Sequence, residues 1–201
     1  MKIVVYGATG MVGSQVVQTA VARGHEVTAV SRSGADVTGA TSRAADIGDT
    51  GTLVALASGA DAVVLAVPTD RTGGPTEPIV DAHRRIIAAR PDARVLVVGG
   101  AGSLLVGDGR LVDAPGFPDA YKPEAAAFTV ILDDYQASEG LDWTYVSPSP
   151  MIAPGERTGY VLGTDSPAGD SVTTSDFADA IVDELETPAY AGRRFTVASK
   201  G

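Results

Sequence analysis

The chain has 201 residues, enough for one domain with a sizeable core, and 44% of them are hydrophobic, which excludes an intrinsically disordered protein. A formal net charge of −10 repels nucleic acid and anionic membrane surfaces, so we expect partners of neither kind. The absence of cysteine excludes disulfides, cysteine nucleophiles and thiolate zinc sites, and we expect no metal. We also expect a cytosolic protein without a signal peptide or membrane span.

A glycine-rich turn between a strand and a helix opens the chain. Residues 3–6 predict a buried strand, and the amphipathic run after the turn ends before Gly24, a helix-ending residue. Gly7 allows a tight turn, Gly10 allows a pyrophosphate to approach the backbone, and Gly13 allows the helix to pack close to the strand. A flexible turn is the simpler alternative, but the helix start offers free N–H groups to an anion, which favours nucleotide binding. No Lys-Ser or Lys-Thr pair closes the turn, which excludes an ATP-binding P-loop.

The ends of the second and third predicted strands bear on the cofactor. An acidic residue after the second strand would bind the adenosine ribose and favour NAD, but this chain has Ser31 and Arg32. A hydroxyl and a guanidinium suit a 2′-phosphate, which favours NADP, while NAD stays possible and Arg32 could be a solvated strand-end residue. After the third strand, Asp46 could accept a hydrogen bond from the adenine amino group or simply start a turn.

The middle of the chain continues the alternation of strands and helices. The apolar run 62–67 predicts a central parallel strand, and a Gly- and Pro-rich loop follows it at the edge where ligands bind. A helix over 79–89 carries His83, which we expect on its solvated face. A fifth strand is predicted over 94–98, followed by a glycine-rich segment.

The second half contains the two segments that we assign to the substrate side. Residues 104–123 have no clear period and predict a long active-site loop, and 149–172 predict a loop or hairpin over the same edge. The helix predicted between them has an apolar stripe at helical spacing, formed by Phe128, Ile131, Leu132 and Tyr135. We therefore expect Tyr135 to be a core residue.

The remaining elements complete an α/β pattern. A sixth strand is predicted over 143–146, a helix capped by Thr173 or Thr174 follows, and a last strand covers 194–198. Strands and helices that alternate from end to end predict a doubly wound parallel sheet in three α/β/α layers. We expect residues 1–201 to form a single domain.

Several motifs together resemble a known superfamily. GATGMVGS, SRS after the second strand and Asp46-Ile47 after the third resemble the atypical short-chain dehydrogenase/reductases, nearest their NmrA-like and biliverdin reductase B-like branch. The later motifs resemble a narrower bacterial family often described as proposed NADH–flavin reductases; they are VVGGAGSLLV, DWTYVSPSPM, PGERTGYVLG, SDFADAIVDELE and RRFTVAS. The resemblance covers nearly the whole chain and implies an NAD(P)-binding Rossmann fold.

The resemblance also implies a set of cofactor-binding residues beside Gly7 and Gly13. They are Thr9, Gly10, Met11 and Val12 at the pyrophosphate; Ser31 and Arg32 at the adenosine ribose; Asp46 and Ile47 at the adenine; Ala66, Val67 and Pro68 at the nicotinamide ribose; and Gly99, Gly100 and Pro148 to Met151 at the nicotinamide.

One departure from the superfamily pattern concerns catalysis. Catalytic members carry a tyrosine and, four residues later, a lysine that lowers the tyrosine pKa for proton exchange with a carbonyl or alcohol. Here Tyr121 is followed at once by Lys122, and position 125 is alanine. Tyr135 is followed four residues later by Glu139. We therefore do not expect the alcohol–ketone mechanism.

A flavin-type acceptor would explain this departure. Hydride transfer from nicotinamide C4 to flavin N5 needs little acid–base help, so we predict an NAD(P)H-dependent oxidoreductase that uses NADPH to reduce a flavin or a similar conjugated small molecule. The flavin would be a substrate rather than a bound cofactor. Ser103 and Tyr121 are candidate polar groups near the acceptor, although Ser103 could be a loop hydroxyl and Tyr121 a loop anchor.

Two other functions stay open. A non-catalytic NAD(P)-binding redox sensor, as in some NmrA-like proteins, needs the glycine turn but no catalytic pair. A sugar-nucleotide epimerase or dehydratase is less favoured, because the Tyr–Lys pair is missing and the C-terminal region is short. The oligomeric state is also open between a monomer and a homodimer.

Overall fold

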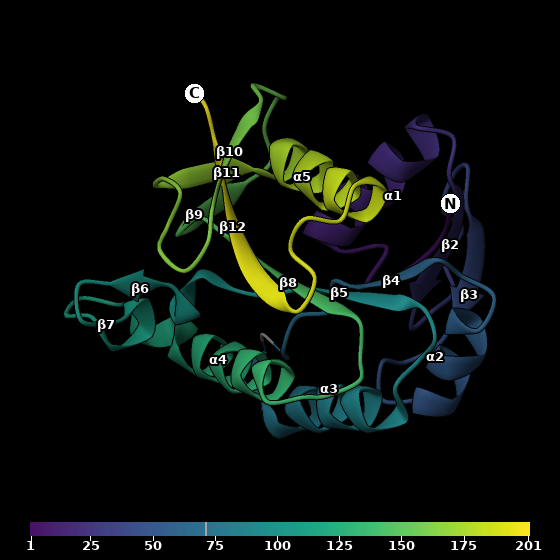
Figure 1. Ribbon diagram of the computed structural model, residues 1–201, viewed down its shortest axis with the longest axis horizontal. Helices are drawn as coiled ribbons and strands as arrows, with labels where there is room; N and C mark the ends of the chain where they lie inside the picture. Colours follow the sequence, from purple (N-terminus) through teal and green to yellow (C-terminus); the bar gives the residue numbers. More distant parts are fainter. Residues whose placement is uncertain (71) are drawn as a thin grey trace.

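The computed structural model describes residues 1–70 and 72–201 and is built around an eight-stranded sheet with helices on both faces (Figure 1). The strand order is β10-β12-β8-β5-β4-β1-β2-β3. The strands of this sheet are β1 (Lys2–Tyr6), β2 (Glu26–Ser31), β3 (Thr41–Ala44), β4 (Ala62–Leu65), β5 (Arg94–Val98), β8 (Trp143–Pro148), β10 (Tyr160–Gly163) and β12 (Arg193–Ser199). The helices are α1 (Met11–Ala22), α2 (Thr50–Ala57), α3 (Glu77–Ala89), α4 (Lys122–Gln136) and α5 (Thr174–Glu186).

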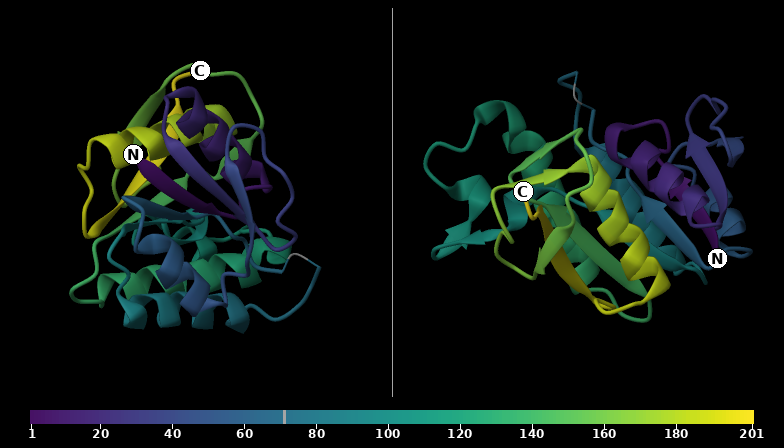
Figure 2. Two further views of the ribbon diagram at one scale, coloured as in Figure 1. Left: turned by 90° about the vertical axis from the view of Figure 1, so that its right-hand side faces the viewer. Right: turned by 90° about the horizontal axis from the view of Figure 1, so that it is seen from above.

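The helices form two layers, one on each face of the sheet. In Figure 2, α1 and α5 lie on one side of the sheet, and α2, α3 and α4 lie on the other. Alternate residues of a strand point to opposite faces, so Ile3 and Val5 pack in the core under α1 and α5, whereas Val4 and Tyr6 pack in the core under the other three helices. Both faces of the sheet are therefore buried, which confirms the doubly wound α/β fold.

One strand runs against the others. β10 pairs with β12 in antiparallel register, with Tyr160 opposite Ser199, whereas the other pairings in the large sheet are parallel. This strand lies in the segment predicted as a loop or hairpin, and it ends the sheet at one edge. The sheet is thus mostly parallel, with an antiparallel edge strand.

Both segments predicted as substrate-side loops contain short ordered elements. Between β5 and α4 lie β6 (Leu105–Val106), β7 (Gly109–Arg110) and the 3₁₀ turns η1 (Ala101–Ser103), η2 (Leu111–Asp113) and η3 (Asp119–Tyr121). Between β8 and α5, β9 (Met151–Ala153) pairs with β11 (Ser171–Thr173), which lies against β12. Strands of two to four residues are too short to show a period, which is why the sequence predicted loops here.

His83 is the clearest error among the sequence predictions. It is 1% exposed rather than solvated, and its Nδ1 atom lies 3.1 Å from the hydroxyl oxygen of Tyr135 on α4. Burial lowers the pKa of His83 to about 3, so the ring is neutral at physiological pH. His83 is three and four residues after Val80 and Ile79, on the inner face of α3, and the Tyr135 hydroxyl satisfies its polar atom. Tyr135 itself is fully buried, as predicted.

The structure identifies which of the two predicted threonines caps the last helix. Thr173 is the N-cap of α5, and its side-chain oxygen accepts a hydrogen bond from the Asp176 N–H. Within residues 1–70 and 72–201, every helix is too short or too polar to cross a membrane.

Candidate functional site

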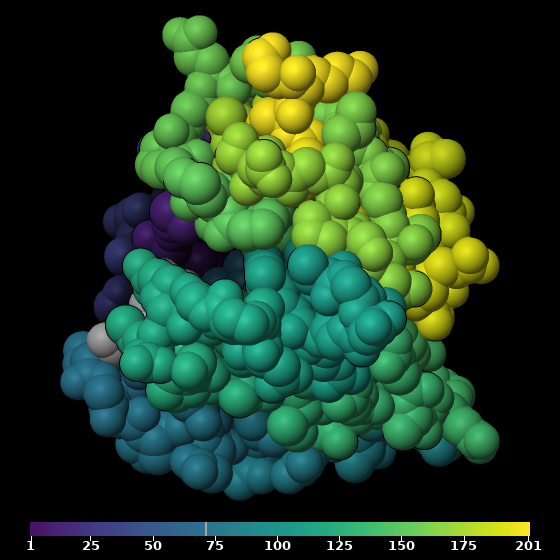
Figure 3. Space-filling view, turned by 90° about the vertical axis from the view of Figure 1, so that its left-hand side faces the viewer, coloured from purple at the N-terminus to yellow at the C-terminus, as the bar shows by residue number. Residues whose placement is uncertain are grey.

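The candidate site lies at the edge of the sheet where the parallel strands end. β1 lies between β2 and β4, and the chain crosses from one side of β1 to the other after β3, which makes this the switch point where ligands bind in such folds. Figure 3 looks onto this edge and shows N-terminal residues, in purple, at the bottom of a hollow. A teal segment that follows β5 and a green segment that follows β8 form its walls. The hollow therefore joins the predicted cofactor and substrate sides.

The glycine turn is a cradle lined by backbone. Gly7 has φ +77, and its N–H and that of Ala8 donate to the Val30 carbonyl at 3.0 and 3.1 Å, which ties the turn to β2. A Cβ atom on Gly7 would lie 2.2 Å from the Ala66 carbonyl oxygen, and one on Gly13 would lie 2.2 Å from the Gly7 carbonyl oxygen. Both glycines are thus required by close backbone approach.

The start of α1 leaves its donors open to a ligand. Gly10 is the N-cap residue and supplies no side-chain hydrogen bond, and the first turn of the helix has no acidic residue. The first N–H groups of a helix have no partner within the helix, and the helix dipole makes this end attractive to anions. The turn and the helix start therefore fit a dinucleotide diphosphate held by backbone N–H groups of the predicted residues Thr9, Met11, Val12 and Gly13, whereas the N–H of Gly10 already donates to the Gly7 carbonyl at 2.9 Å.

The end of β2 also fits a phosphorylated ribose. Ser31 is 9% exposed, and among the described residues its hydroxyl has no hydrogen-bond partner. Arg32 follows as an exposed residue. Hydrogen bonds from Thr72 lower the pKa of Asp70, and the positive charge of Arg32 lowers it further. The Arg32 guanidinium therefore interacts electrostatically with the loop after β4. A free hydroxyl beside an exposed cation suits a 2′-phosphate.

The predicted adenine contacts have structural roles of their own. The Oδ1 atom of Asp46 accepts a hydrogen bond from the Gly48 N–H at 2.8 Å, so this residue does form the turn that the sequence allowed as an alternative. Ile47 is 7% exposed and packs in the core under α2 and α3. Their contact with adenine stays a prediction.

The predicted nicotinamide side is formed by the ends of β4, β5 and β8. The Ala66 N–H donates to the Tyr6 carbonyl at 3.0 Å, and Val67 and Pro68 become progressively more exposed beyond it. A Cβ atom on Gly99 would lie 2.1 Å from the Tyr145 ring, so packing already requires this glycine. Pro148 is buried at the end of β8. The three strand ends reach the same edge of the sheet, and their contact with nicotinamide stays a prediction.

The two candidate catalytic residues lie in different environments. Ser103 is 3% exposed, and its Oγ atom accepts a hydrogen bond from Nη1 of Arg194 at 3.1 Å. Tyr121 is 66% exposed and ends the turn before α4. Lys122, its neighbour, forms an ion pair with Asp119 at 2.7 Å. Ser103 therefore has a structural partner, and a role in chemistry for either candidate stays a prediction.

The sequence analysis did not identify Arg194 as a residue that joins distant segments of the chain. This arginine is buried on β12 and contacts Ser103 and Asp165, which are 91 and 29 residues away in sequence. The only available signal was an arginine and a threonine alternating with apolar residues in RRFTVAS. Thr69 was also missed: it is 6% exposed and its hydroxyl donates to Glu124 at 2.8 Å, which joins the loop after β4 to the start of α4.

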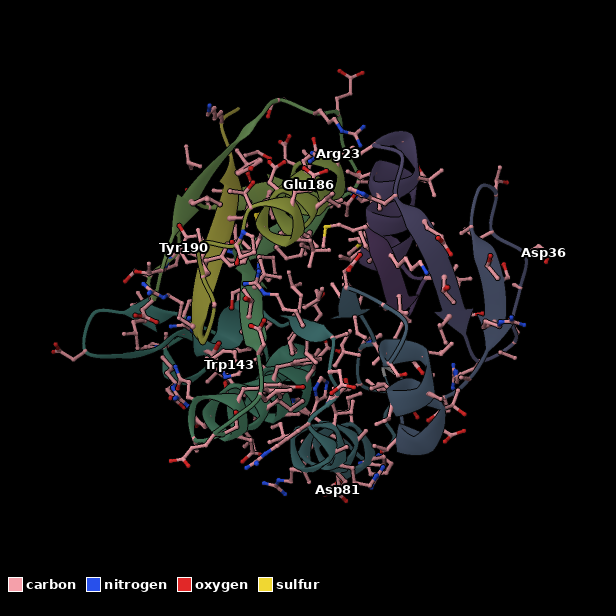
Figure 4. The ribbon with its side chains drawn as sticks, turned by 45° about the vertical axis from the view of Figure 1, so that its right-hand side comes forward. Arg23, Asp36, Asp81, Trp143, Glu186 and Tyr190 are labelled. Atoms are coloured by element: carbon pink, nitrogen blue, oxygen red, sulfur yellow. The ribbon has the colours of Figure 1, made fainter. Side chains whose placement is uncertain are left out.

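A further cavity lies away from the strand ends. Its volume is about 210 Å³, and it is lined by residues of α5, β10, β12 and the segment between α5 and β12, among them Tyr160, Asp183 and Tyr190. Figure 4 shows Glu186 of its rim beside Arg23, with which it forms an ion pair at 3.0 Å. Among the described residues, no three His, Asp or Glu side chains gather closely enough to hold a metal ion.

Comparison with known proteins agrees with this geometry. A family model described as NAD(P)H-binding matches residues 7–188. The uncharacterized protein YwnB of Bacillus subtilis (strain 168) is 38% identical over 100% of this chain and 99% of its own length.

Two solved structures are similar over almost their full length. A protein of Streptococcus pneumoniae TIGR4 proposed to be an NADH-flavin reductase is 32% identical, with a TM-score of 0.82 over 100% of both chains. A protein of Burkholderia pseudomallei proposed to be exported is 35% identical, with a TM-score of 0.87 over 98% of this chain and 99% of the other. With the backbone cradle at the start of α1, these matches show that the chain belongs to the NAD(P)H-binding family with a Rossmann fold.

Proposed function

We propose that the protein is a reductase that uses NADPH to reduce a flavin or a similar conjugated small molecule, and that it does so in the cytosol. The observation that carries the proposal is the backbone cradle of Gly7 and Gly13, which has no room for a side chain and opens onto the start of α1. The free hydroxyl of Ser31 beside Arg32 supports NADPH as the donor. The likeness to a proposed NADH-flavin reductase over the whole chain supports the class of acceptor.

When bound, NADPH supplies a hydride, and reduction of a flavin is completed by one proton from solvent, so one NADPH is oxidised for each acceptor reduced. The chain then has to bind and orient both molecules rather than exchange protons. Its side chains agree with that task. Tyr135 is buried, and burial raises its pKa, while Lys122 is paired with Asp119, so neither forms the tyrosine–lysine pair of an alcohol dehydrogenase.

The reductase proposal is tested by measuring whether the protein turns over NADPH with an acceptor. The purified protein is expected to oxidise NADPH in the presence of FMN, riboflavin or a quinone, followed by the loss of NADPH absorbance. Gly13→Ala provides the background, because its Cβ atom would clash with the Gly7 carbonyl oxygen and the cradle could not keep its shape. If the wild-type protein binds NADPH but turns over none of these acceptors, the reductase proposal fails.

A non-catalytic sensor is the second candidate. The observation that favours it is that Ser103 is buried and held by Arg194, while Tyr121 is exposed, so these two candidates do not form a proton-donating pair. A sensor is expected to distinguish NADPH from NADP⁺ by affinity without consuming either. Calorimetry with both forms, in parallel with the turnover test, separates the two functions.

Replacing Arg32 by alanine tests the choice of cofactor. We expect NADPH to bind about tenfold more weakly, with NADH affinity unchanged, because a charge-assisted contact to a phosphate is worth about 1.4 kcal/mol or more. Arg193→Ala removes an exposed arginine from the other half of the sheet and serves as the control. An equal loss of affinity for NADPH and NADH in Arg32→Ala would overturn the assignment of the 2′-phosphate.

A further inference from the structure

Arg194 forms hydrogen bonds to two separate segments of the chain. Nη1 donates to the backbone carbonyl of Ser103 at 2.8 Å and to its hydroxyl at 3.1 Å. Nη2 donates to the backbone carbonyl of Asp165 at 3.1 Å and to its carboxylate at 2.6 Å. One guanidinium on β12 thus joins η1, which follows β5, to the segment that follows β10.

The two segments also meet directly. The N–H of Leu105 donates to the Asp165 carbonyl at 2.8 Å, so that carbonyl receives hydrogen bonds from both Leu105 and Arg194. The planar fork of an arginine can satisfy several acceptors in a fixed geometry, whereas a lysine cannot. Arg194 is therefore placed to fix the position of the two segments relative to each other.

The cost of burying this side chain argues against a role in stability alone. The Arg194 side chain is 4% exposed, whereas its charge partner Asp165 is 58% exposed. Buried ion pairs are weak stabilisers, and apolar residues in their place are often as stable or more so. Among the described residues, Nε of Arg194 and the hydroxyls of Ser147 and Thr196 are buried without partners, although Ser147 and Thr196 are aligned in neighbouring strands. These unpartnered polar atoms add to the cost of burying the Arg194 side chain.

The joined segments belong to the two walls of the hollow at the strand ends (Figure 3). Ser103 leads into the segment between β5 and α4, and Asp165 lies in the segment between β8 and α5. The predicted cofactor contacts at Gly7 to Gly13 and at the end of β2 lie on the other half of the sheet. Arg194 is thus connected to the predicted acceptor side and not to the predicted diphosphate site.

We propose that Arg194 is a positioning residue that holds the two acceptor-side segments in register and thereby sets the affinity for the acceptor. The inference rests on the proposed function, because it assigns these segments to the acceptor. Arg194 acts through Ser103 and Asp165 and does not itself contact the reacting atoms.

The experiment compares Arg194→Met and Asp165→Ala with Arg193→Met. Methionine keeps an apolar stem and removes every donor, and Asp165→Ala removes one contact from an exposed residue, so it tests the idea even if Arg194→Met folds poorly. Arg193 is exposed on the same strand and is the matched control. Amide hydrogen exchange, the KM of the acceptor and the NADPH dissociation constant are measured for each variant.

In Arg194→Met, amide exchange in residues 103–106 and 163–166 is expected to rise about tenfold or more, since these amides lose a constraint that closes the region. The acceptor KM is expected to rise about tenfold with a smaller change in kcat, and the NADPH dissociation constant to stay within about twofold of wild type. Asp165→Ala is expected to change the same quantities in the same direction by less. Arg193→Met is expected to match wild type.

Unchanged exchange in both segments would overturn the proposal, and so would faster exchange with an unaltered acceptor KM. Equal weakening of NADPH and acceptor binding would also overturn it, because it would indicate a general loss of structure. A wild-type protein that reduces no acceptor removes the proposed function, and the exchange rates then still decide whether Arg194 holds the two segments.

Discussion

Gly13→Ala is expected to abolish measurable NADPH binding. The added methyl group would lie 2.2 Å from the carbonyl oxygen of Gly7, much closer than atoms can approach, and the clashing atom is backbone that is fixed by two strands. The helix start would have to move away from the turn, so the N–H groups of the proposed anion site would separate. We expect a loss of more than about 100-fold in affinity, equivalent to about 2.8 kcal/mol.

Calorimetric titration with NADPH measures this effect, and two variants control for it. A Cβ atom on Gly59 would meet nothing within 4 Å, so Gly59→Ala is expected to bind as wild type does. Gly10→Ala is expected to lose less NADPH affinity than Gly13→Ala, because its Cβ atom would lie 3.2 Å from the Gly7 carbonyl oxygen. Wild-type affinity in a folded Gly13→Ala would show that the diphosphate does not bind at this turn.

Glu184→Gln is expected to lower the free energy of unfolding by about 3–5 kcal/mol, because it removes the nearest charged partner of a buried cation and leaves only Asp142, which is 3.8 Å away and 61% exposed. Arg94 on β5 and Glu184 on α5 form an ion pair at 2.6 Å, and their side chains are 8% and 4% exposed. The Glu184 carboxylate also accepts hydrogen bonds from the N–H groups of Ala189 and Tyr190 at 3.0 and 2.9 Å. An amide cannot satisfy all of these donors.

Urea denaturation measures this loss, and Glu186→Gln is the matched control. Glu186 is two residues further along the same helix, and its ion pair with Arg23 and its hydrogen bond with His25 involve a side chain that is 34% exposed. A pair of this kind contributes about 0–1 kcal/mol. Equal destabilisation by the two substitutions would show that the buried pair is not the dominant contact between α5 and the sheet.

The cofactor half of the fold was predictable because it depends on local sequence. Gly7, Gly10 and Gly13 act through backbone geometry that their own spacing specifies, and continuous apolar runs such as 62–67 predict parallel strands directly. The turn, the helix that follows it and the alternation of strands and helices along the chain are therefore predictable from the sequence.

The features that the sequence did not predict depend on contacts between residues that are far apart in the chain. Nothing next to His83 in the sequence indicates that Tyr135, 52 residues away, would satisfy its ring nitrogen in the core. Ser103 looked like a free loop hydroxyl because its partner Arg194 is 91 residues away. The strands β6, β7, β9 and β11 are two or three residues long, so no periodicity could reveal them.

The segments assigned to the dinucleotide and those assigned to the acceptor lie mostly on opposite sides of the boundary between β4 and β5, and this has a consequence for how relatives can diverge. The segments assigned to the dinucleotide come mostly from one continuous stretch that ends at Pro68, whereas the walls of the hollow come from later segments held together across the fold by Arg194. Under the proposed function, insertions and substitutions in the later part would exchange the oxidant while the electron donor stayed the same. A chimera that keeps residues 1–70 of this chain and takes the remainder from a relative would accordingly inherit its nucleotide preference from one parent and its acceptor from the other.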